Sequence, residues 1–285
     1  MVAIYSNPAS AQTANALYRN DRVMDGVIER LSTGKRINSA ADDPAGLAIA
    51  TRLTSQVNGL NQAARNANNA ISMVQIADNA ADTLDNIFQR MREIVVQAAD
   101  GSNSASDIAL LNTEFTALAE ETDRLVDTTS YNGRNIIDGN ADESGGSSVT
   151  YQVGSNAGIE QTLTIDFGDL NLGNGGLGGD FSSWKTTGLG SNLNTTLTDI
   201  DTAISAVATQ RATYGASLNR LEYAVDNLHS ASLTTSIARG RIEDTNYAAE
   251  TARLAKQQIL EQVGTALLAQ ANVEAKSVLK LLDAN

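Results

Sequence analysis

The residues of this chain that could carry out chemistry are few, and their spacing assembles no reactive site. His229 is the only histidine and no cysteine occurs, so a histidine metal cluster, a catalytic triad and thiolate chemistry lack their residues. Asp42 and Asp43 are adjacent carboxylates, but they directly precede Pro44 and are explained more simply as helix caps. The sequence therefore predicts no catalytic, cofactor-binding or metal-binding residues, and it predicts that the protein is not an enzyme.

Other binding functions are also disfavoured by composition. The glycines of 173–179 precede no Gly-Lys-Ser/Thr and open no evident helix, so they do not match a phosphate-binding loop. The formal net charge of -13 argues against binding to nucleic acid, which requires basic patches. No apolar run approaches the ~18 residues of a membrane span. We therefore expect neither a nucleic acid nor a membrane as partner.

Two long stretches carry apolar residues at alternating steps of three and four. The first extends from Leu53 to Ala98 and the second from Leu193 to Leu228, where Arg211 interrupts the pattern. This spacing places one narrow apolar stripe on one side of a helix, which is typical of a coiled coil. At 1.5 Å per residue the first helix is roughly 70 Å long. The pattern predicts a mainly α, elongated rod.

Short capping signals predict where the helices begin and end. Asn7-Pro8 and Asp43-Pro44 each combine a helix N-cap with a proline in the first turn, and Gly34 is suited to end the first helix. Ser104 with Asp107 three residues later resembles a capping box for a third helix.

The middle of the sequence is unsuited to helix, because 13 of the 22 glycines lie between residues 139 and 190. Residues 149–153 and 162–167 are rich in β-branched residues and predict a β-hairpin near 149–167. Asn132-Gly133 predicts a tight turn. Trp184, the one tryptophan, is expected in a small local core rather than in a ligand platform.

The C-terminal region from Ala248 to Leu282 is predicted to be a helix that is apolar almost all round. Such a helix must be buried on every side, and only further copies of the chain are bulky enough to surround it. The candidate polymerisation residues are Leu254, Ile259, Leu260, Val263, Leu267, Leu268, Leu281 and Leu282.

Several long motifs resemble those of bacterial flagellin. In the N-terminal half they are IERLSTGKRINSAADDPAG at 28–46, NQAARNANNAISM at 61–73 and QRMREIVVQ at 89–97. In the C-terminal half they are RIEDTNYA at 241–248 and QILEQVGTALLAQAN at 258–272. The resemblance covers roughly residues 1–170 and 193–282.

The resemblance implies an antiparallel coiled-coil rod in which the N- and C-terminal segments pair. Residues 1–43 and 241–285 would form terminal helices of an inner tube. Residues 44–170 and 193–240 would form the rod core with the hairpin, and residues 171–192 would be a short, glycine-rich outer segment. The chain would thus be a short flagellin with a minimal outer domain.

The implied function is structural: copies of the chain would polymerise into the flagellar filament that drives motility. The implied partners are the chain itself, a flagellar export chaperone, the filament cap and hook-associated proteins. The implied location is extracellular, with export that needs no cleaved signal peptide, and residues 1–10 show no such signal. Two alternatives remain: a hook–filament junction protein and a secreted amphipathic-helix toxin or adhesin.

A recognition surface is also implied. Flagellins that resemble this chain are recognised by an innate-immune Toll-like receptor through a patch on the long helix. The matching residues, which would also contact neighbouring protomers, are Gln89, Arg90, Glu93, Ile94, Gln97 and Glu114. Helical spacing places Arg90, Glu93, Ile94 and Gln97 on one face, and we expect that face to point outward, because Phe88, Met91 and Val95 belong to the internal seam.

Overall fold

Both halves of the sequence contribute to each of two structural units. The computed structural model describes residues 7–173, 176–189 and 192–283, with residues 275–283 described by their backbone alone. The terminal unit comprises Met1–Ser55 and Thr234–Asn285, and the central unit comprises Gln56–Leu233.

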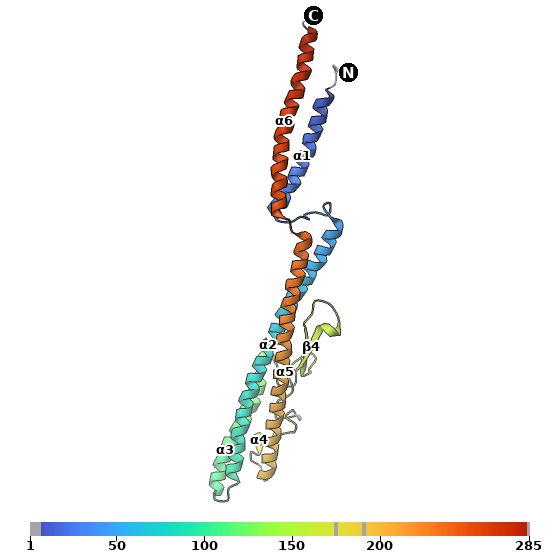
Figure 1. The fold of residues 1–285 in the computed structure, drawn as a ribbon. Coiled ribbons are helices and arrows are strands. Elements are labelled where there is room, and N and C mark those ends of the chain that lie inside the picture. The colour runs from blue at the N-terminus through green and yellow to red at the C-terminus, as the bar shows by residue number, and fades with distance from the viewer. Residues whose placement is uncertain (1–6, 174–175, 190–191, 284–285) are drawn as a thin grey trace. The chain divides into compact units, whose positions relative to one another are not determined.

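The described residues are mostly helical, with short strands in the middle of the sequence (Figure 1). The helices are α1 (Pro8–Thr33), α2 (Pro44–Ala98), α3 (Ala105–Thr128), α4 (Ser183–Thr186), α5 (Leu193–Glu243) and α6 (Tyr247–Asp283), with a 3₁₀ turn η1 (Ile159–Gln161). The strands are β1 (Ser130–Tyr131), β2 (Arg134–Asn135), β3 (Ser148–Gln152) and β4 (Thr162–Asp166). The predicted mainly α fold with a small β region is confirmed.

The predicted caps form, except at Asp42. Asp43 accepts from Gly46 N in the first turn of α2, whereas the Asp42 carboxylate accepts from Asn38 N and Ser39 N and so stabilises the preceding loop. The Asn7 side chain accepts a hydrogen bond from Ser10 N at 3.1 Å at the start of α1, and Gly34 ends this helix with a φ of 73°. Ser104 and Asp107 make the reciprocal hydrogen bonds of a capping box at the start of α3. These side chains satisfy backbone groups that a helix end leaves unpaired, which is why the helices begin and end where the sequence indicated.

The central unit is built around the seam between α2 and α5. Along α5, the buried residues Ile200, Val207, Tyr214, Leu221 and Leu228 repeat every seven residues, as the sequence pattern predicts. The α2 residues in the main core are Ala67, Ala70, Met73, Val74, Ala77, Ala80, Ala81, Leu84, Phe88, Met91, Ile94, Val95 and Ala98. This set is wider than the predicted single stripe.

The extra buried residues of α2 lie under other elements of the central unit. Met73, for example, lies beneath the β3–β4 hairpin, whose Tyr151 hydroxyl donates to Met73 Sδ at 2.8 Å. Burial raises the pKa of Tyr151 to about 12. A helix covered from two directions buries two adjacent stripes rather than one.

The predicted hairpin is confirmed as the antiparallel pair β3–β4, which runs from Ser148 opposite Asp166 to Gln152 opposite Thr162. Side-chain amides of the long helices bind its backbone. Asn66 of α2 donates to Gln152 O at 3.2 Å, and Gln210 of α5 donates to Asp166 O at 2.8 Å. The hairpin is thereby held to both long helices.

The predicted tight turn is also present, joining β1 to β2. Asn132 and Gly133 have φ values of 53° and 78°. Two successive positive φ angles are typical of a type I′ turn, which favours Asn-Gly.

Trp184 of α4 packs into an aromatic cluster, so it is a core residue, although not of the small local core that the sequence predicted. Its ring stacks on Phe181 with centroids 4.6 Å apart and meets Phe88 of α2 and Phe115 of α3 edge-on at 6.3 and 5.9 Å. The cluster joins the glycine-rich segment to α2 and α3, so Trp184 belongs to the main core rather than to a separate small one.

The terminal unit is built mainly from α1 and α6, which run antiparallel (Figure 1). Asn7 Nδ2 donates to Ala271 O at 2.9 Å near one end of the pair. At the other end, Thr245 N donates to Gly34 O at 3.0 Å, and Arg36 N donates to Glu243 O at 2.6 Å. Two helices with one shared interface leave most of their surface uncovered.

Candidate functional site

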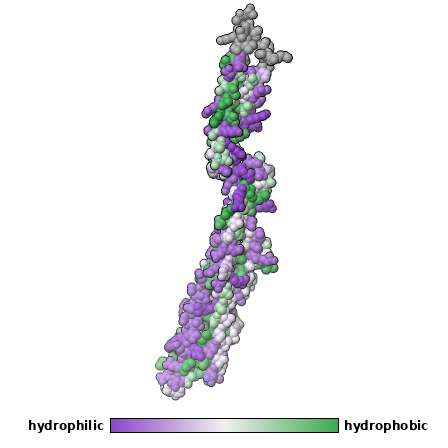
Figure 2. Space-filling view, viewed as in Figure 1, coloured by the Kyte–Doolittle hydropathy of each residue, from purple (hydrophilic) through white to green (hydrophobic). Residues whose placement is uncertain are grey.

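The most prominent surface feature of the terminal unit is its exposed apolar residues. On α6, Ile259, Leu260, Val263 and Leu267 are 59, 46, 49 and 56% exposed. Hydrophobic residues reach the visible face of the α1–α6 pair alongside hydrophilic ones (Figure 2). Exposed aliphatic residues at this density are typical of a surface that another polypeptide covers.

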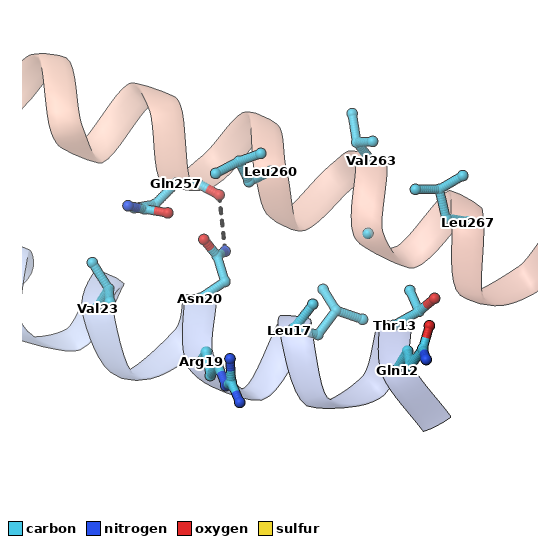
Figure 3. Close-up of a pocket in the computed structure, with 12 residues that line it drawn as sticks. Gln12, Thr13, Leu17, Arg19, Asn20, Val23, Gln257, Leu260, Val263 and Leu267 are labelled. Atoms are coloured by element: carbon cyan, nitrogen blue, oxygen red, sulfur yellow. Dashed lines mark hydrogen bonds between the residues drawn. The ribbon is translucent and has the colours of Figure 1, made fainter. Parts of the chain in front are cut away.

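Several of these residues line a groove between the two helices. The groove has a volume of about 530 Å³ and is lined by Gln12, Thr13, Ala16, Leu17, Arg19, Asn20, Val23, Gln257, Leu260, Val263, Gly264 and Leu267. Leu17 of α1 lies across from Leu260, Val263 and Leu267 of α6 (Figure 3). The lining is mainly aliphatic, with amides along its length.

Gly264 of α6 lies directly against Leu17 of α1. A Cβ atom at this position would lie 2.7 Å from Leu17 Cδ2, so a larger residue would require the Leu17 side chain to move. Asn20, which is 9% exposed, donates from Nδ2 to Gln257 O at 3.0 Å, and its Oδ1 has no partner in the described structure. A buried asparagine between apolar neighbours is a device that favours one register over others.

A charged cluster lies further along the same helix pair, and the sequence analysis missed it. Glu250 is 5% exposed, and its Oε1 lies 3.0 Å from Arg253 Nη1 and 3.6 Å from Arg30 Nε. A buried carboxylate needs such partners, because desolvation of an isolated charge is costly. The spacing of Glu250 and Arg253 was visible in the sequence, but the contribution of α1 was not.

The structure places the predicted polymerisation residues on α6 in two groups. Ile259, Leu260, Val263 and Leu267 are exposed, whereas Leu254 and Leu268 are half-buried. Leu281 and Leu282 belong to α6, but their side chains lie outside the described residues. Among the six candidates whose side chains the structure describes, one protomer therefore leaves four largely uncovered.

The second candidate surface, on the central unit, is a charged patch on α2 and α3. Arg90 Nε donates to Glu114 Oε1 at 2.9 Å, Arg90 Nη2 lies 2.7 Å from the same oxygen, and Arg90 Nη1 donates to Glu93 Oε2 at 2.9 Å. Hydrogen bonds to Glu114 and then to Glu93 raise the pKa of Arg90. The patch is preorganised, because these contacts hold the guanidinium in one orientation.

A shallow depression of about 470 Å³ lies beside this ion pair and is lined by Gln89, Arg92, Glu93, Val96 and Gln97. The structure thus brings Gln89, Glu93 and Gln97 together as the sequence predicted. Val96, which is 51% exposed, supplies an aliphatic surface that the sequence analysis did not include.

Ile94 corrects one part of the prediction. Its side chain is fully buried in the main core, so it does not point outward beside Arg90. The reason is that α3 packs along this side of α2, as the Arg90–Glu114 contact shows, and Ile94 lies one turn from Arg90. Val96, not Ile94, is the exposed aliphatic residue of this region.

The described residues contain no group of three or more His, Asp or Glu side chains arranged to hold a metal ion. Among the same residues, no helix combines the length and hydropathy that a membrane crossing requires. The fold and its surfaces define a helical protein suited to contacts with other polypeptides.

The sequence places this chain in a known family. Residues 4–142 match the bacterial flagellin N-terminal helical region, and residues 197–282 match the bacterial flagellin C-terminal helical region. The chain is 39% identical to a flagellin of Halalkalibacterium halodurans over 90% of each chain. It is 34% identical to a flagellin of Bacillus subtilis over 98% of this chain and 99% of that protein. The chain belongs to the bacterial flagellin family.

A structural comparison shows that the fold extends beyond flagellins. A putative flagellar hook-associated protein from Vibrio parahaemolyticus has a TM-score of 0.57 and 16% identity, with 71% of this chain and all of that chain covered. At this identity the likeness concerns the fold alone. The sequence, rather than the fold, separates this chain from hook-associated proteins.

Proposed function

We infer that this chain is the structural subunit of a bacterial flagellar filament and that it polymerises through its terminal unit. Family membership supports the filament role. The observation that carries the mechanism is the aliphatic surface of the α1–α6 pair, where Leu260, Val263 and Leu267 are about half exposed in one protomer. Covering each of these side chains contributes on the order of 1 kcal/mol, which a polymer repeats at every copy.

The roles that we propose for the segments of the chain follow from the same surface. The terminal segments, 1–43 and 241–285, would form an inner tube in which copies cover one another's apolar faces. The segments 44–170 and 193–240 would form the surrounding shell, and 171–192 would be the outer segment. No catalytic role is proposed for any of these parts.

A deletion tests this mechanism. Removal of the last roughly 30 residues should leave a soluble monomer whose central unit still folds, because the central core contains none of them. Sedimentation measures assembly, circular dichroism measures folding and electron microscopy shows filaments. Normal filaments from the shortened chain would contradict the proposal.

A point substitution gives a sharper version with a matched control. Val263→Asp should prevent filament growth, because it places a charge on the groove. Gln262→Asp adds the same charge at an adjacent exposed position outside the groove lining and should assemble normally. Equal assembly of the two variants would show that the groove is not an interface.

The same experiment addresses a hook–filament junction role. A junction protein would stop after few copies, whereas a filament subunit seeded with fragments should elongate without limit. The 39% identity to a flagellin favours the filament subunit. No observation favours a membrane-active toxin or adhesin.

We further propose that the chain acts outside the cell and is exported through the flagellar apparatus without a cleaved signal peptide. Its partners would include an export chaperone, the filament cap and hook-associated proteins. Family membership supports these roles. Mass spectrometry of the N-terminus of the filament protein tests the absence of cleavage.

The patch formed by Gln89, Arg90, Glu93, Gln97 and Glu114 is proposed as a contact between protomers. It is also the proposed binding surface for the innate-immune Toll-like receptor that recognises flagellin. The preorganised Arg90 supports both roles, because arginine is enriched among residues that dominate binding energy. Ile94 is buried and would act only by supporting the helix from inside.

A further inference from the structure

The apolar seam of the central unit is ambiguous about the register of its two long helices. The buried residues of α5 repeat every seven residues, and the first half of the α2 seam is mainly alanine. The buried alanines of this part of α2 are Ala63, Ala64, Ala67, Ala70 and Ala77. Small side chains offer few shape differences, so a slide of seven residues would again place apolar residues opposite apolar residues.

Polar contacts between the same helices follow one register, and Arg211 also contacts Asp78, one turn before its level partner Asp82. Arg211 Nη1 of α5 lies 2.8 Å from Asp82 Oδ1 of α2, and Arg92 Nε of α2 lies 2.8 Å from Asp201 Oδ1 of α5. A step of ten residues forward along α2, from Asp82 to Arg92, is thus matched by ten residues backward along α5. A single alignment of the two antiparallel helices therefore satisfies both contacts.

A third contact extends this register to the alanine-rich end. Ser232 Oγ of α5 lies 2.8 Å from Asn61 Oδ1 of α2. Relative to Asp82 and Arg211, both residues are displaced by 21 positions in opposite directions, which is three heptads. The polar contacts thus follow the seam at the spacing that the apolar repeat allows.

We propose that Asp82, Arg92, Asp201 and Arg211 form a register lock that selects this one pairing of α2 with α5. The lock works because each helix contributes an acid followed ten residues later by a base, and the antiparallel pairing places each acid opposite a base. A slide by ten residues would bring Asp82 level with Asp201 in one direction and Arg92 level with Arg211 in the other. Like charges would then face each other.

Slides by one heptad are disfavoured by the same residues. In one direction Asp201 would lie level with Asp85, Arg92 would lie level with Asn194, and Arg211 would keep only Asp78 nearby. In the other direction Arg92 would lie level with Ala208, and Arg211 would lie level with Gln89, with Asp85 in the place that Asp78 holds now. Either slide loses the Arg92–Asp201 pair and one of the two carboxylates of Arg211. Exposed ion pairs contribute little stability individually, so the lock acts through the difference in free energy between the native pairing of the helices and the slipped pairings.

The lock matters for assembly because a regular polymer requires identical protomers. A slipped copy would present a different surface. The proposal itself concerns the folding of a single protomer, so its test does not depend on whether the chain polymerises as proposed above.

The chain contains no cysteine, which permits a direct test by disulfide trapping. Asn61→Cys with Ser232→Cys reports the native register, because these side chains are in contact. Asn61→Cys with Val225→Cys reports a slide of one heptad. Each full-length reporter is unfolded in denaturant and refolded under a mild oxidant, and the linked peptides are quantified by mass spectrometry.

With the lock intact, we expect the native reporter to link almost completely and the slipped reporter only slightly. In Arg92→Asp with Arg211→Asp, where acids face acids, the slipped link should rise by about tenfold. Exchange of the partners, Arg92→Asp with Asp201→Arg, should restore the native result. Arg65→Asp changes the same type of exposed residue, whose hydrogen bonds stay on its own helix, and should change neither link.

Two results would overturn the lock. One is an unchanged ratio of native to slipped links in Arg92→Asp with Arg211→Asp, which would assign the register to packing alone. The other is a slipped link in the exchanged variant as large as in the disrupted one. Loss of both links in the disrupted variant would also count against the proposal, since the lock chooses between pairings and is not required for pairing itself.

Discussion

The terminal and central units use similar amphipathic helices but differ in how many elements cover each helix. In the central unit, α2 is covered by α5, by α3 and by the β3–β4 hairpin, and its core includes fully buried residues such as Leu84 and Phe88. In the terminal unit, α6 is covered along its length mainly by α1, and Leu267 remains 56% exposed. The two units therefore differ in how many elements cover each long helix.

Because of this difference, the hydrophobic effect plays a different role in each unit. Apolar burial that is complete within one chain stabilises the protomer, and apolar surface that stays open contributes only when a second chain covers it. The central unit is therefore the part that should fold alone. The terminal unit should reach full stability only on assembly.

The largest expected effect comes from a charge placed in the closed core. Leu221→Asp should destabilise the central unit by about 3–5 kcal/mol, because Leu221 is fully buried and the new carboxylate would lack a partner. Asn219→Asp, at an exposed position of the same helix, should change stability by less than about 0.5 kcal/mol. Denaturant unfolding measures both, and equal midpoints would mean that the seam is incorrectly assigned.

A smaller effect is expected from the buried ion cluster of the terminal unit. Glu250→Gln should weaken the α1–α6 pair by about 1–2 kcal/mol, because it leaves Arg30 and Arg253 without their carboxylate. Hydrogen exchange of amides in α1 measures this local effect while the central unit stays unchanged. Glu29→Gln, an exposed neighbour of Arg30, is the control, and faster exchange in that variant would point to net charge instead.

The capping box of α3 should contribute about as much to the free energy of unfolding as an ordinary helix cap. Ser104→Ala should cost about 1 kcal/mol, measured by thermal unfolding of the central unit. Ser106→Ala, inside the helix, is the matched control, because its hydroxyl lies 3.4 Å from Ser104 Oγ but makes no capping bond to the backbone. A larger loss from Ser106→Ala would show that the cap is not the source of the effect.

The same box predicts a pH dependence. Hydrogen bonds from the Ser104 side chain and backbone lower the pKa of Asp107 from its ordinary value of 3.8. A depressed folded-state pKa means that the stabilisation is present above pH 3.8 and is lost as the pH falls through the lower, folded value. Ser104→Ala should reduce this acid sensitivity, and an unchanged acid unfolding curve would contradict the assignment.

Sequence patterns predicted the features that depend on local chemistry. The cap at Asn7, the Asn132-Gly133 turn and the heptad positions of α5 need only neighbouring residues, and all are confirmed. Ile94 was assigned to the wrong face because the spacing of apolar residues shows where one stripe lies but not how many elements cover the helix. The same limit applies to Glu250, whose partner Arg30 is distant in sequence.

Arg211 is a residue that the sequence marks as unusual without showing its role. Its interruption of the apolar pattern was visible in the sequence, but the contacts that it makes were not. In the structure its guanidinium lies 3.2 Å from Asp78 Oδ1 and 2.8 Å from Asp82 Oδ1 across the seam. A break in periodicity thus marked a specific contact rather than a weak point.

The smallest expected effect on stability concerns the exposed patch of the central unit, where folding and recognition should separate. Arg90→Ala should leave thermal unfolding almost unchanged, because exposed ion pairs contribute little and Phe88 and Met91 still fill the core beneath. The same change should weaken activation of cells that carry the flagellin-recognising Toll-like receptor, because it removes the guanidinium held by Glu114 and Glu93.

Ile94→Ala should do the reverse and destabilise the fold by about 2–4 kcal/mol, since its side chain is buried. Unfolding curves and dose–response curves of the two monomeric variants, compared with the unmodified chain, separate these effects. A wild-type monomer that does not bind the receptor ectodomain would leave the patch as a contact between protomers only.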